Sequence, residues 1–421
     1  MELAAGEVTS SSGEPAGNGG SLQREPARSG RFASWNPLRC GGTALPAELL
    51  LMAKLVALAL LLTGHVRLMP EPFLSFVPFI EGILPPAVFR LTLQALFLGS
   101  ALALLFNRSV RLSSLVLGLT ILTAVTASKA YYGNNKTMCG TLLFLTGLYH
   151  PRTGPWTLRA QLVIVYFGAG LNKLLDPDWQ TGVFFDHWAS RRLEQPLYLW
   201  AAALFPPLVL GKILCWMTTA VELGLAAAFC IPRFYPAAVW VSLLFHASLL
   251  EFTGQTFTMF FYAMESAMLA FVTWPREKAV IYDGDCGICN RIRAAMERLD
   301  FDGAFAWRTL QSGIGGRFGI ARAALEKEMY LAADGRLYAG FRAVKMILLT
   351  LPAFHLGVAA LIAAPPAGWG WYRRVVVGLL LAFFFPLFNP AGQAVYEWFA
   401  RNRHRFSSGG ACAVPSKDGA R

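Results

Sequence analysis

The sequence predicts a multi-pass α-helical membrane bundle followed by a small α/β domain. The first observation is composition, since 55% of the 421 residues are hydrophobic and only 15% are charged. Soluble proteins carry about 25% charged residues. The second is a series of apolar runs between positions 45 and 275, each near the roughly 20 residues that a spanning helix needs. The third is the segment Val280–Asn290, VIYDGDCGICN, which begins a strand–turn–helix pattern.

The chain begins with residues 1–44, which are rich in Gly, Ser, Ala, Pro and Glu. That composition cannot bury a core and predicts a disordered tail. The first apolar run starts too far along for an ordinary signal peptide, so we expect it to stay as a membrane helix. Residues 45–275 then predict about eight helices. The apolar runs centre near Ala57, Leu98, Gly118, Leu143, Val165, Ala220, Leu243 and Ala267.

Basic residues in the short loops predict the orientation, because cytoplasmic loops carry an excess of Lys and Arg. With an inside amino terminus, most of the loop cations fall inside. We therefore expect an integral protein of the bacterial inner membrane, with the amino terminus and the cysteine domain in the cytoplasm. The net charge of +12 is scattered along the chain, so the bilayer is the expected partner and nucleic acid is not.

Two cysteines follow the apolar run Ala279–Tyr282, where a turn at Asp283-Gly284 leads into a helical pattern. A helix start favours an anion such as the Cys286 thiolate. Cys289 lies three residues on, so the two sulfurs come within disulfide reach. Cys286 can then attack a disulfide and Cys289 can resolve the mixed disulfide.

Charges beside the pair act in opposite directions. Arg291 and Arg293 add positive potential, whereas Asp283 and Asp285 would raise the pKa of a thiol. Three other interpretations stay open: a static disulfide, two buried thiols, or half a zinc site that only His404 and Cys412 could complete. We expect no metal. A cytoplasmic pair stays mostly reduced, which favours catalysis over a structural bridge.

Residues Val280–Arg291 resemble the signature of the DCC family of thiol-disulfide oxidoreductase-like proteins, named for Asp-Cys-x-x-Cys. The likeness continues through 329–340, a helix around 343–349, and 395–405, which resembles the closing helix of the family. The resemblance implies a thioredoxin-like fold for residues 276–407, followed by a flexible tail at 408–421. No proline precedes the strand at Met329, where thioredoxins place a cis-proline against the cysteines.

An apolar insertion at 351–390 interrupts this domain. Its two apolar stretches are each short for a span. They could form core helices of the domain, a tilted membrane pair, or a hairpin on the membrane surface. We favour docking at the interface because Trp369, Trp371, Tyr372, Arg373 and Arg374 suit a headgroup region.

Ionisable residues inside the expected spans are candidates for function. They are Lys173, Lys212, Glu222, His246, Glu251 and Glu265. Lys212 and Glu251 lie near helix ends, where long side chains reach the interface. Glu222 and His246 lie deeper. They either serve a site or simply pair with each other or with Lys173.

The run Gln161–Phe184 resembles the HTTM membrane domain shared with vitamin K-dependent γ-carboxylases and SdpB-type proteins. The resemblance implies that Lys173 is a base and that the domain binds a quinone or another lipid-like substrate. The substrate-binding candidates are Tyr166, Asn172, Trp179, Glu222 and His246. Nothing here replaces the large extramembrane part of the carboxylase, so we do not expect glutamate carboxylation.

Two hypotheses follow. In the first, the chain is a membrane-tethered thiol-disulfide oxidoreductase whose partner is a protein thiol or disulfide, and a quinone is the one cofactor considered. In the second, the membrane domain binds a lipid or assists the maturation or export of a small product. The cysteine domain is then an interaction module.

Overall fold

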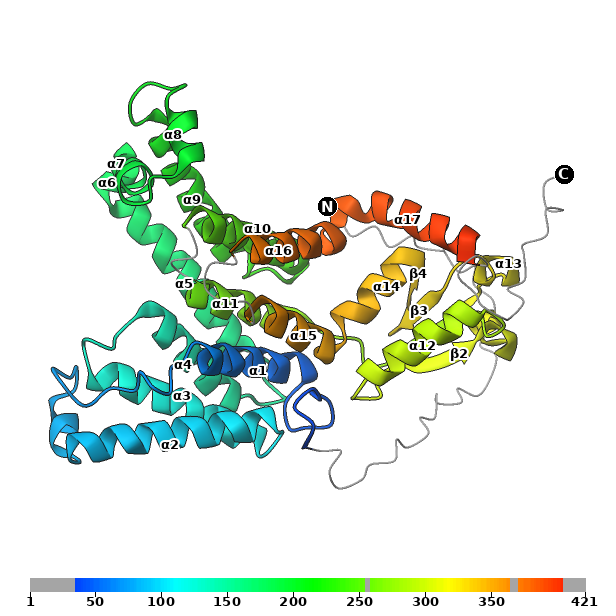
Figure 1. Ribbon diagram of the computed structural model, residues 1–421, viewed down its shortest axis with the longest axis horizontal. Helices are drawn as coiled ribbons and strands as arrows, with labels where there is room; N and C mark the ends of the chain where they lie inside the picture. The colour runs from blue at the N-terminus through cyan, green and yellow to red at the C-terminus, as the bar shows by residue number, and fades with distance from the viewer. Residues whose placement is uncertain (1–34, 254–257, 364–369, 404–421) are drawn as a thin grey trace.

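The computed structural model describes residues 35–253, 258–363 and 370–403. A helical domain comes first and a small α/β domain follows (Figure 1). The helical domain comprises α1 (Ala47–Leu62), α2 (Pro86–Leu105), α3 (Val110–Ala127), α4 (Asn134–Gly147), α5 (Trp156–Leu175), α6 (Pro177–Thr181), α7 (Val183–His187), α8 (Pro196–Ala202), α9 (Val209–Ala228), α10 (Tyr235–Phe252) and α11 (Thr258–Ala267). All eight predicted centres lie within helices of this domain.

Close backbone packing joins α3 to α4. A Cβ atom added at Gly118 would lie 2.4 Å from the Phe144 backbone nitrogen, so only glycine allows this approach. The Ser114 hydroxyl donates a hydrogen bond of 2.7 Å to the Leu143 carbonyl across the same contact. Small residues and interhelical hydrogen bonds are the usual means of packing helices within lipid.

The outer faces of this domain are apolar. Leu91 on α2 and Met217 on α9 are about 60% exposed, at 60% and 58%, as suits contact with lipid. Among the described residues, three helices are long and apolar enough to cross a membrane: α2, α3 and α9. The number reaches five if two bent helix pairs in the second part of the chain each count as one span. These helices indicate a membrane protein.

The small domain is built on a four-stranded mixed sheet of order β2-β1-β3-β4. Strand β1 pairs in parallel with β2 and antiparallel with β3, and β3 pairs antiparallel with β4. This topology is thioredoxin-like, and the predicted fold class is confirmed. The elements are β1 (Lys278–Tyr282), α12 (Gly287–Leu299), β2 (Ala306–Thr309), α13 (Arg322–Leu325), β3 (Tyr330–Ala333), β4 (Arg336–Ala339), α14 (Gly340–Leu349), α15 (Pro352–Ala363), α16 (Gly370–Phe384) and α17 (Asn389–Asn402).

Strand β1 is buried along its whole length and supplies both halves of the core. Val280 packs with Leu331 and with Ala343 of α14. Ile281, which points to the other face, packs with Leu310 and Leu325. The strand is therefore fixed on both faces, and so is the point where it ends.

The apolar insertion packs against the helical domain. Leu356 of α15 joins the core of that domain, and the His355 ring stacks on Trp274 at 6.1 Å. Phe385, just after α16, meets Trp240 of α10 edge to face at 5.6 Å. The insertion thus bridges the two parts, and its docking at a membrane surface stays a prediction. Residues 364–369 of the insertion lie outside the described residues.

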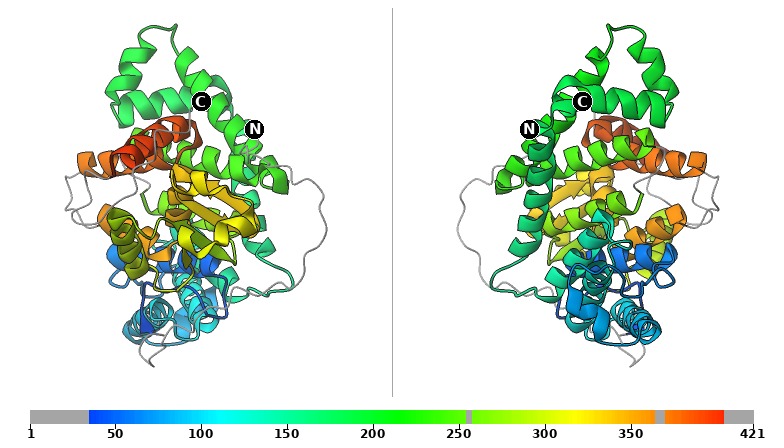
Figure 2. Two further views of the ribbon diagram at one scale, coloured as in Figure 1. Left: turned by 90° about the vertical axis from the view of Figure 1, so that its right-hand side faces the viewer. Right: turned by 90° about the vertical axis from the view of Figure 1, so that its left-hand side faces the viewer.

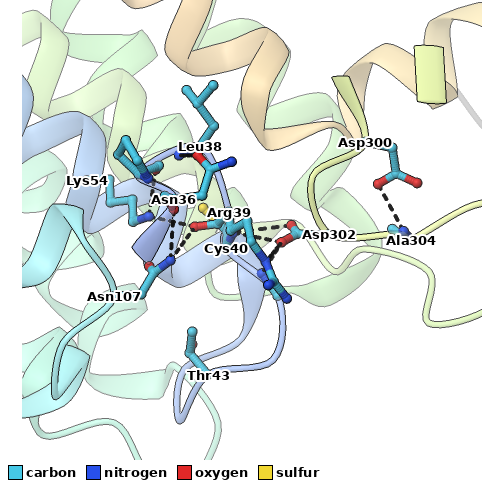
Figure 3. A network of polar contacts seen from close by, with 12 residues as sticks. Asn36, Leu38, Arg39, Cys40, Thr43, Lys54, Asn107, Asp300, Asp302 and Ala304 are labelled. Atoms are coloured by element: carbon cyan, nitrogen blue, oxygen red, sulfur yellow. Dashed lines mark hydrogen bonds and ion pairs between the residues drawn. The ribbon is translucent and has the colours of Figure 1, made fainter. Parts of the chain in front are cut away.

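A segment at 35–46, called the strap here, also joins the two domains (Figure 3). The Asp302 carboxylate accepts hydrogen bonds from the backbone N–H groups of Cys40 and Gly41, at 3.0 and 2.9 Å. On the other side, the buried Lys54 ammonium donates to the carbonyls of Pro37 and Arg39. The predicted disordered tail, residues 1–44, therefore includes residues that make ordered contacts: Pro37, Arg39, Cys40 and Gly41. Residues 1–34, and the predicted tail at 408–421, lie outside the described residues.

Candidate functional site

Two cysteines lie where β1 turns into α12. Cys286 is the residue that immediately precedes the first turn of α12, and Cys289 lies one turn inside the helix. The turn is tight, since a Cβ atom at Gly284 would come 2.7 Å from the Thr309 side chain. The Asn290 amide donates 2.7 Å to the Gly284 carbonyl and closes the loop. The structure thus has the strand, turn and helix that the sequence predicts.

The two sulfurs differ in exposure. Both are reduced thiols, but Cys286 has no exposed surface whereas Cys289 is half-buried. Burial raises the pKa of Cys289, and its hydrogen bond to Cys286 and the nearby Cys286 charge raise it further. A thiol that keeps its proton is a donor, so Cys289 can donate to the Cys286 sulfur. The two sulfurs are thus in hydrogen-bond contact.

Asp283 holds the loop together. It is 7% exposed, and its Oδ1 atom accepts from the Asp285 N–H at 3.1 Å and from the Gln311 amide at 3.2 Å. The same Gln311 amide donates 2.8 Å to Asp285. The charge of Asp283 acts to raise the pKa of Cys289, in the direction that the sequence analysis expects for the thiols. Both acids of the cysteine loop are thus bound by the Gln311 amide.

A positive charge at this site comes from the residue that follows α17. Arg403 follows α17, and its Nη2 atom lies 3.5 Å from Asp283 Oδ2 and donates 2.9 Å to the Glu326 carbonyl. Its charge acts to lower the pKa of Cys289. Arg293, which the sequence proposed for this role together with Arg291, pairs with Glu297 at 3.1 Å. Sequence reasoning missed Arg403 and Gln311, and only the likeness of 395–405 to a closing helix pointed to this region.

Strand β3 begins beside the same helix. The Met329 N–H donates 3.0 Å to the Tyr396 hydroxyl of α17. No peptide bond among the described residues is cis. A side chain of α17 therefore binds the backbone just before β3. His404 and Cys412, the residues that could complete a zinc site, lie outside the described residues. The described residues contain no group of three or more potential metal ligands.

A second set of polar side chains lies inside the helical domain. The Lys173 ammonium on α5 binds both Glu222 carboxylate oxygens of α9, at 2.8 and 2.9 Å. It also lies 5.0 Å from the centre of the Trp179 ring. Glu222 is 8% exposed. A buried acid and base that neutralise each other reduce the cost of placing charge in an apolar region.

Next to this pair is a chain of four further groups. The Tyr166 hydroxyl is 2.8 Å from Ser242 Oγ and 3.4 Å from His246 Nε2. The other ring nitrogen of His246 is 3.0 Å from a Glu265 oxygen. The second Glu265 oxygen is buried and has no hydrogen-bond partner among the described residues. Of the predicted binding residues, the structure brings Tyr166, Trp179, Glu222 and His246 to these contacts, whereas Asn172 is exposed.

Comparison with known families agrees with the two-part arrangement. The model of the HTTM domain matches residues 150–274, and the model of the DCC1-like thiol-disulfide oxidoreductase matches residues 280–377. No curated protein and no solved structure matches the chain. The chain is therefore a fusion of an HTTM domain with a DCC1-like thiol-disulfide oxidoreductase domain, as the resemblances imply. Gln311 lies inside the second match, and Arg403 lies beyond it.

Proposed function

We propose that the small domain is a thiol-disulfide oxidoreductase in which Cys286 attacks and Cys289 resolves. The observation that carries this proposal is the placement of two reduced thiols, hydrogen-bonded to each other, at the start of α12. The unpartnered N–H groups and the dipole at that point stabilise a thiolate. Asp283 and Asp285 act as positioning residues that hold the loop.

The reaction is a two-step exchange. The Cys286 thiolate attacks one sulfur of a partner disulfide, so a mixed disulfide forms and the other partner sulfur leaves as a thiolate that takes up a proton. Cys289 then loses its proton and attacks the Cys286 sulfur, which releases the second partner thiol. The dithiol is oxidised to a disulfide and the partner disulfide is reduced. The reverse sequence oxidises a partner dithiol.

The expected partner is a water-soluble protein thiol or disulfide. The loop after α12 binds the strap through Asp302, so that end of α12 faces the helical domain. The 13 residues of α12 span about 20 Å, so the start of this helix lies at the opposite end, beside α13 and the end of α17 (Figure 1). The left view of Figure 2 has the small domain in front of the helical domain. With the expected orientation, this end faces the cytoplasm.

The test uses the full chain in lipid nanodiscs and a protein disulfide as the substrate. Cys289→Ser should accumulate a mixed disulfide, seen as a shifted band on a non-reducing gel. Cys286→Ser should not, and wild type should pass through it transiently. If Cys286→Ser traps the partner instead, the roles of the two cysteines are reversed. This is the main alternative, because Cys289 is the more exposed of the two. If neither variant traps, the redox function is wrong.

For the helical domain we propose a site for a quinone or another lipid-like ligand at the Lys173–Glu222 and Tyr166–His246–Glu265 contacts. The hydroxyl of a quinol, the reduced form, needs a hydrogen-bond acceptor in apolar surroundings, and a buried Glu265 oxygen without a partner among the described residues supplies an open position. Lys173 would be the base, and it must first leave Glu222, whose two carboxylate oxygens it binds. Native mass spectrometry of the purified protein should find a bound quinone or lipid. It should be lost in Tyr166→Phe/His246→Gln and kept in Asn172→Ala.

A second candidate function is the binding of lipid without redox chemistry. It is favoured by an apolar groove of about 320 Å³ between α2 and α3. The groove is lined by Ile83, Leu84, Phe89, Thr92, Leu93, Leu96, Val116, Leu119, Thr120 and Thr123. Leu93→Trp should fill it. Loss of a co-purified lipid in that variant, together with the absence of disulfide trapping, would favour this function over the first.

A further inference from the structure

Arg403 makes a three-way connection at the dithiol. Its guanidinium reaches the Asp283 carboxylate of the cysteine loop and the Glu326 carbonyl that follows α13. The Arg403 and Asp283 side chains are only 11% and 7% exposed. A buried pair of this kind costs free energy to assemble unless its geometry and further hydrogen bonds compensate. Asp283 has those further bonds, from Asp285 and Gln311.

The rest of α17 is fixed to the same domain. Tyr396 binds the Met329 N–H of the strand edge. Gly392 packs so closely on the Phe341 ring that an added Cβ atom would lie 2.1 Å away. Gln393 accepts from the Phe341 N–H at 3.1 Å. Together with Arg403, these contacts hold α17 at three levels along its length, and the level of Arg403 is the one beside the cysteines.

We propose that Arg403 is a positioning residue of the dithiol, which acts through Asp283. It fixes the end of α17 over the cysteine loop and provides the positive charge that faces the Cys286–Cys289 pair. This proposal rests on the proposed redox function. It assigns part of the site to a residue beyond the stretch that the DCC1-like family model matches.

The charged and titratable groups around the pair come from three elements. Tyr282 ends β1, Asp283 and Asp285 belong to the loop, and Tyr396 and Arg403 lie within and just after α17. Asp283 and Arg403 have opposite effects on Cys289. Replacing either one should therefore move the ionisation of the pair in a predictable direction, and replacing both should largely cancel.

The experiment measures the rate of thiol alkylation against pH in the reduced full-length protein. Arg403→Gln should raise the midpoint of the profile by roughly half a unit to one unit, because the nearby positive charge is lost. Arg403→Lys should keep the midpoint near wild type. Arg401→Gln is the matched control, since Arg401 lies on the same helix and binds the Glu397 carbonyl of its own turn. It should leave the profile unchanged.

Asp283→Asn is a second variant that tests the proposal if Arg403→Gln does not fold. It removes the negative charge that faces Arg403 and should lower the midpoint. A purely structural Arg403 would change the unfolding temperature and leave every midpoint where it was, and that outcome overturns the proposal. The profile reports ionisation whether or not the pair cycles. Failure of the redox function would instead appear as the absence of any disulfide in wild type.

Discussion

Asp302 offers the most direct test of how the small domain is held on the helical domain. Its buried carboxylate accepts from the N–H groups of Cys40 and Gly41 and lies 3.7 Å from the Arg39 guanidinium. Hydrogen bonds to a charged group contribute about 1.5–3 kcal/mol each. Asp302→Asn keeps one acceptor oxygen and loses the charge, so we expect the strap contact to weaken by about 2–3 kcal/mol.

The Cys40 thiol reports this loss. It has no exposed surface, and burial raises its pKa to about 12, so an alkylating reagent reacts only when the strap detaches. A loss of 2–3 kcal/mol corresponds to an increase of roughly 30- to 150-fold in the detached fraction. With Cys40 as the only cysteine, Asp302→Asn should therefore be alkylated faster by about that factor.

Asp334→Asn is the control for this measurement. Asp334 accepts from the backbone of Arg276 and Glu277, which lie between the two domains and outside the strap. Its rate should stay within a few-fold of wild type. Equal rates in Asp302→Asn and wild type would refute the view that this carboxylate holds the strap.

Three further predictions concern the two sites. Gly284→Ala should lower the free energy of unfolding by about 1–3 kcal/mol in chemical denaturation, because its Cβ atom meets Thr309. Lys173→Met should destabilise by about 3–5 kcal/mol by leaving Glu222 unpaired, and Lys173→Met/Glu222→Gln should recover much of that loss. The raised pKa of Cys289 means that above about pH 9 the unfolded chain loses a proton that the folded chain keeps. The free energy of unfolding should therefore fall as pH rises beyond that point, and the fall should be smaller in Cys289→Ser.

Local patterns were sufficient to predict much of the fold. The apolar runs gave the helices, and the change from the strand formers of Ala279–Tyr282 to a turn and a helical pattern gave the position of the cysteine pair. Each of these features depends on residues that are close in sequence. The packing of Gly118 on Phe144, in contrast, depends on a contact between helices and has no local signal.

The partners of the charged residues were not predictable in the same way. Sequence reasoning placed Glu222, His246 and Lys173 together and left open which would pair. The structure pairs Lys173 with Glu222 and gives His246 to Glu265. Arg291 and Arg293 were chosen because they follow the cysteines directly, but a helix can point such residues away from the pair. The cation that reaches Asp283 is Arg403, which follows α17 and lies more than a hundred positions away in the sequence.

The burial of Cys286 has a consequence for the proposed exchange reaction. A disulfide can be attacked only if it reaches the sulfur, and Cys286 has no exposed surface while Arg403 binds Asp283 and Glu326. Ends of helices open at a lower free energy than the core of a domain. Release of the Arg403 contacts would therefore expose the cysteine loop while the sheet stays intact. It would also remove the positive charge that acts to lower the pKa of Cys289, so access to the dithiol and its ionisation oppose each other in this site.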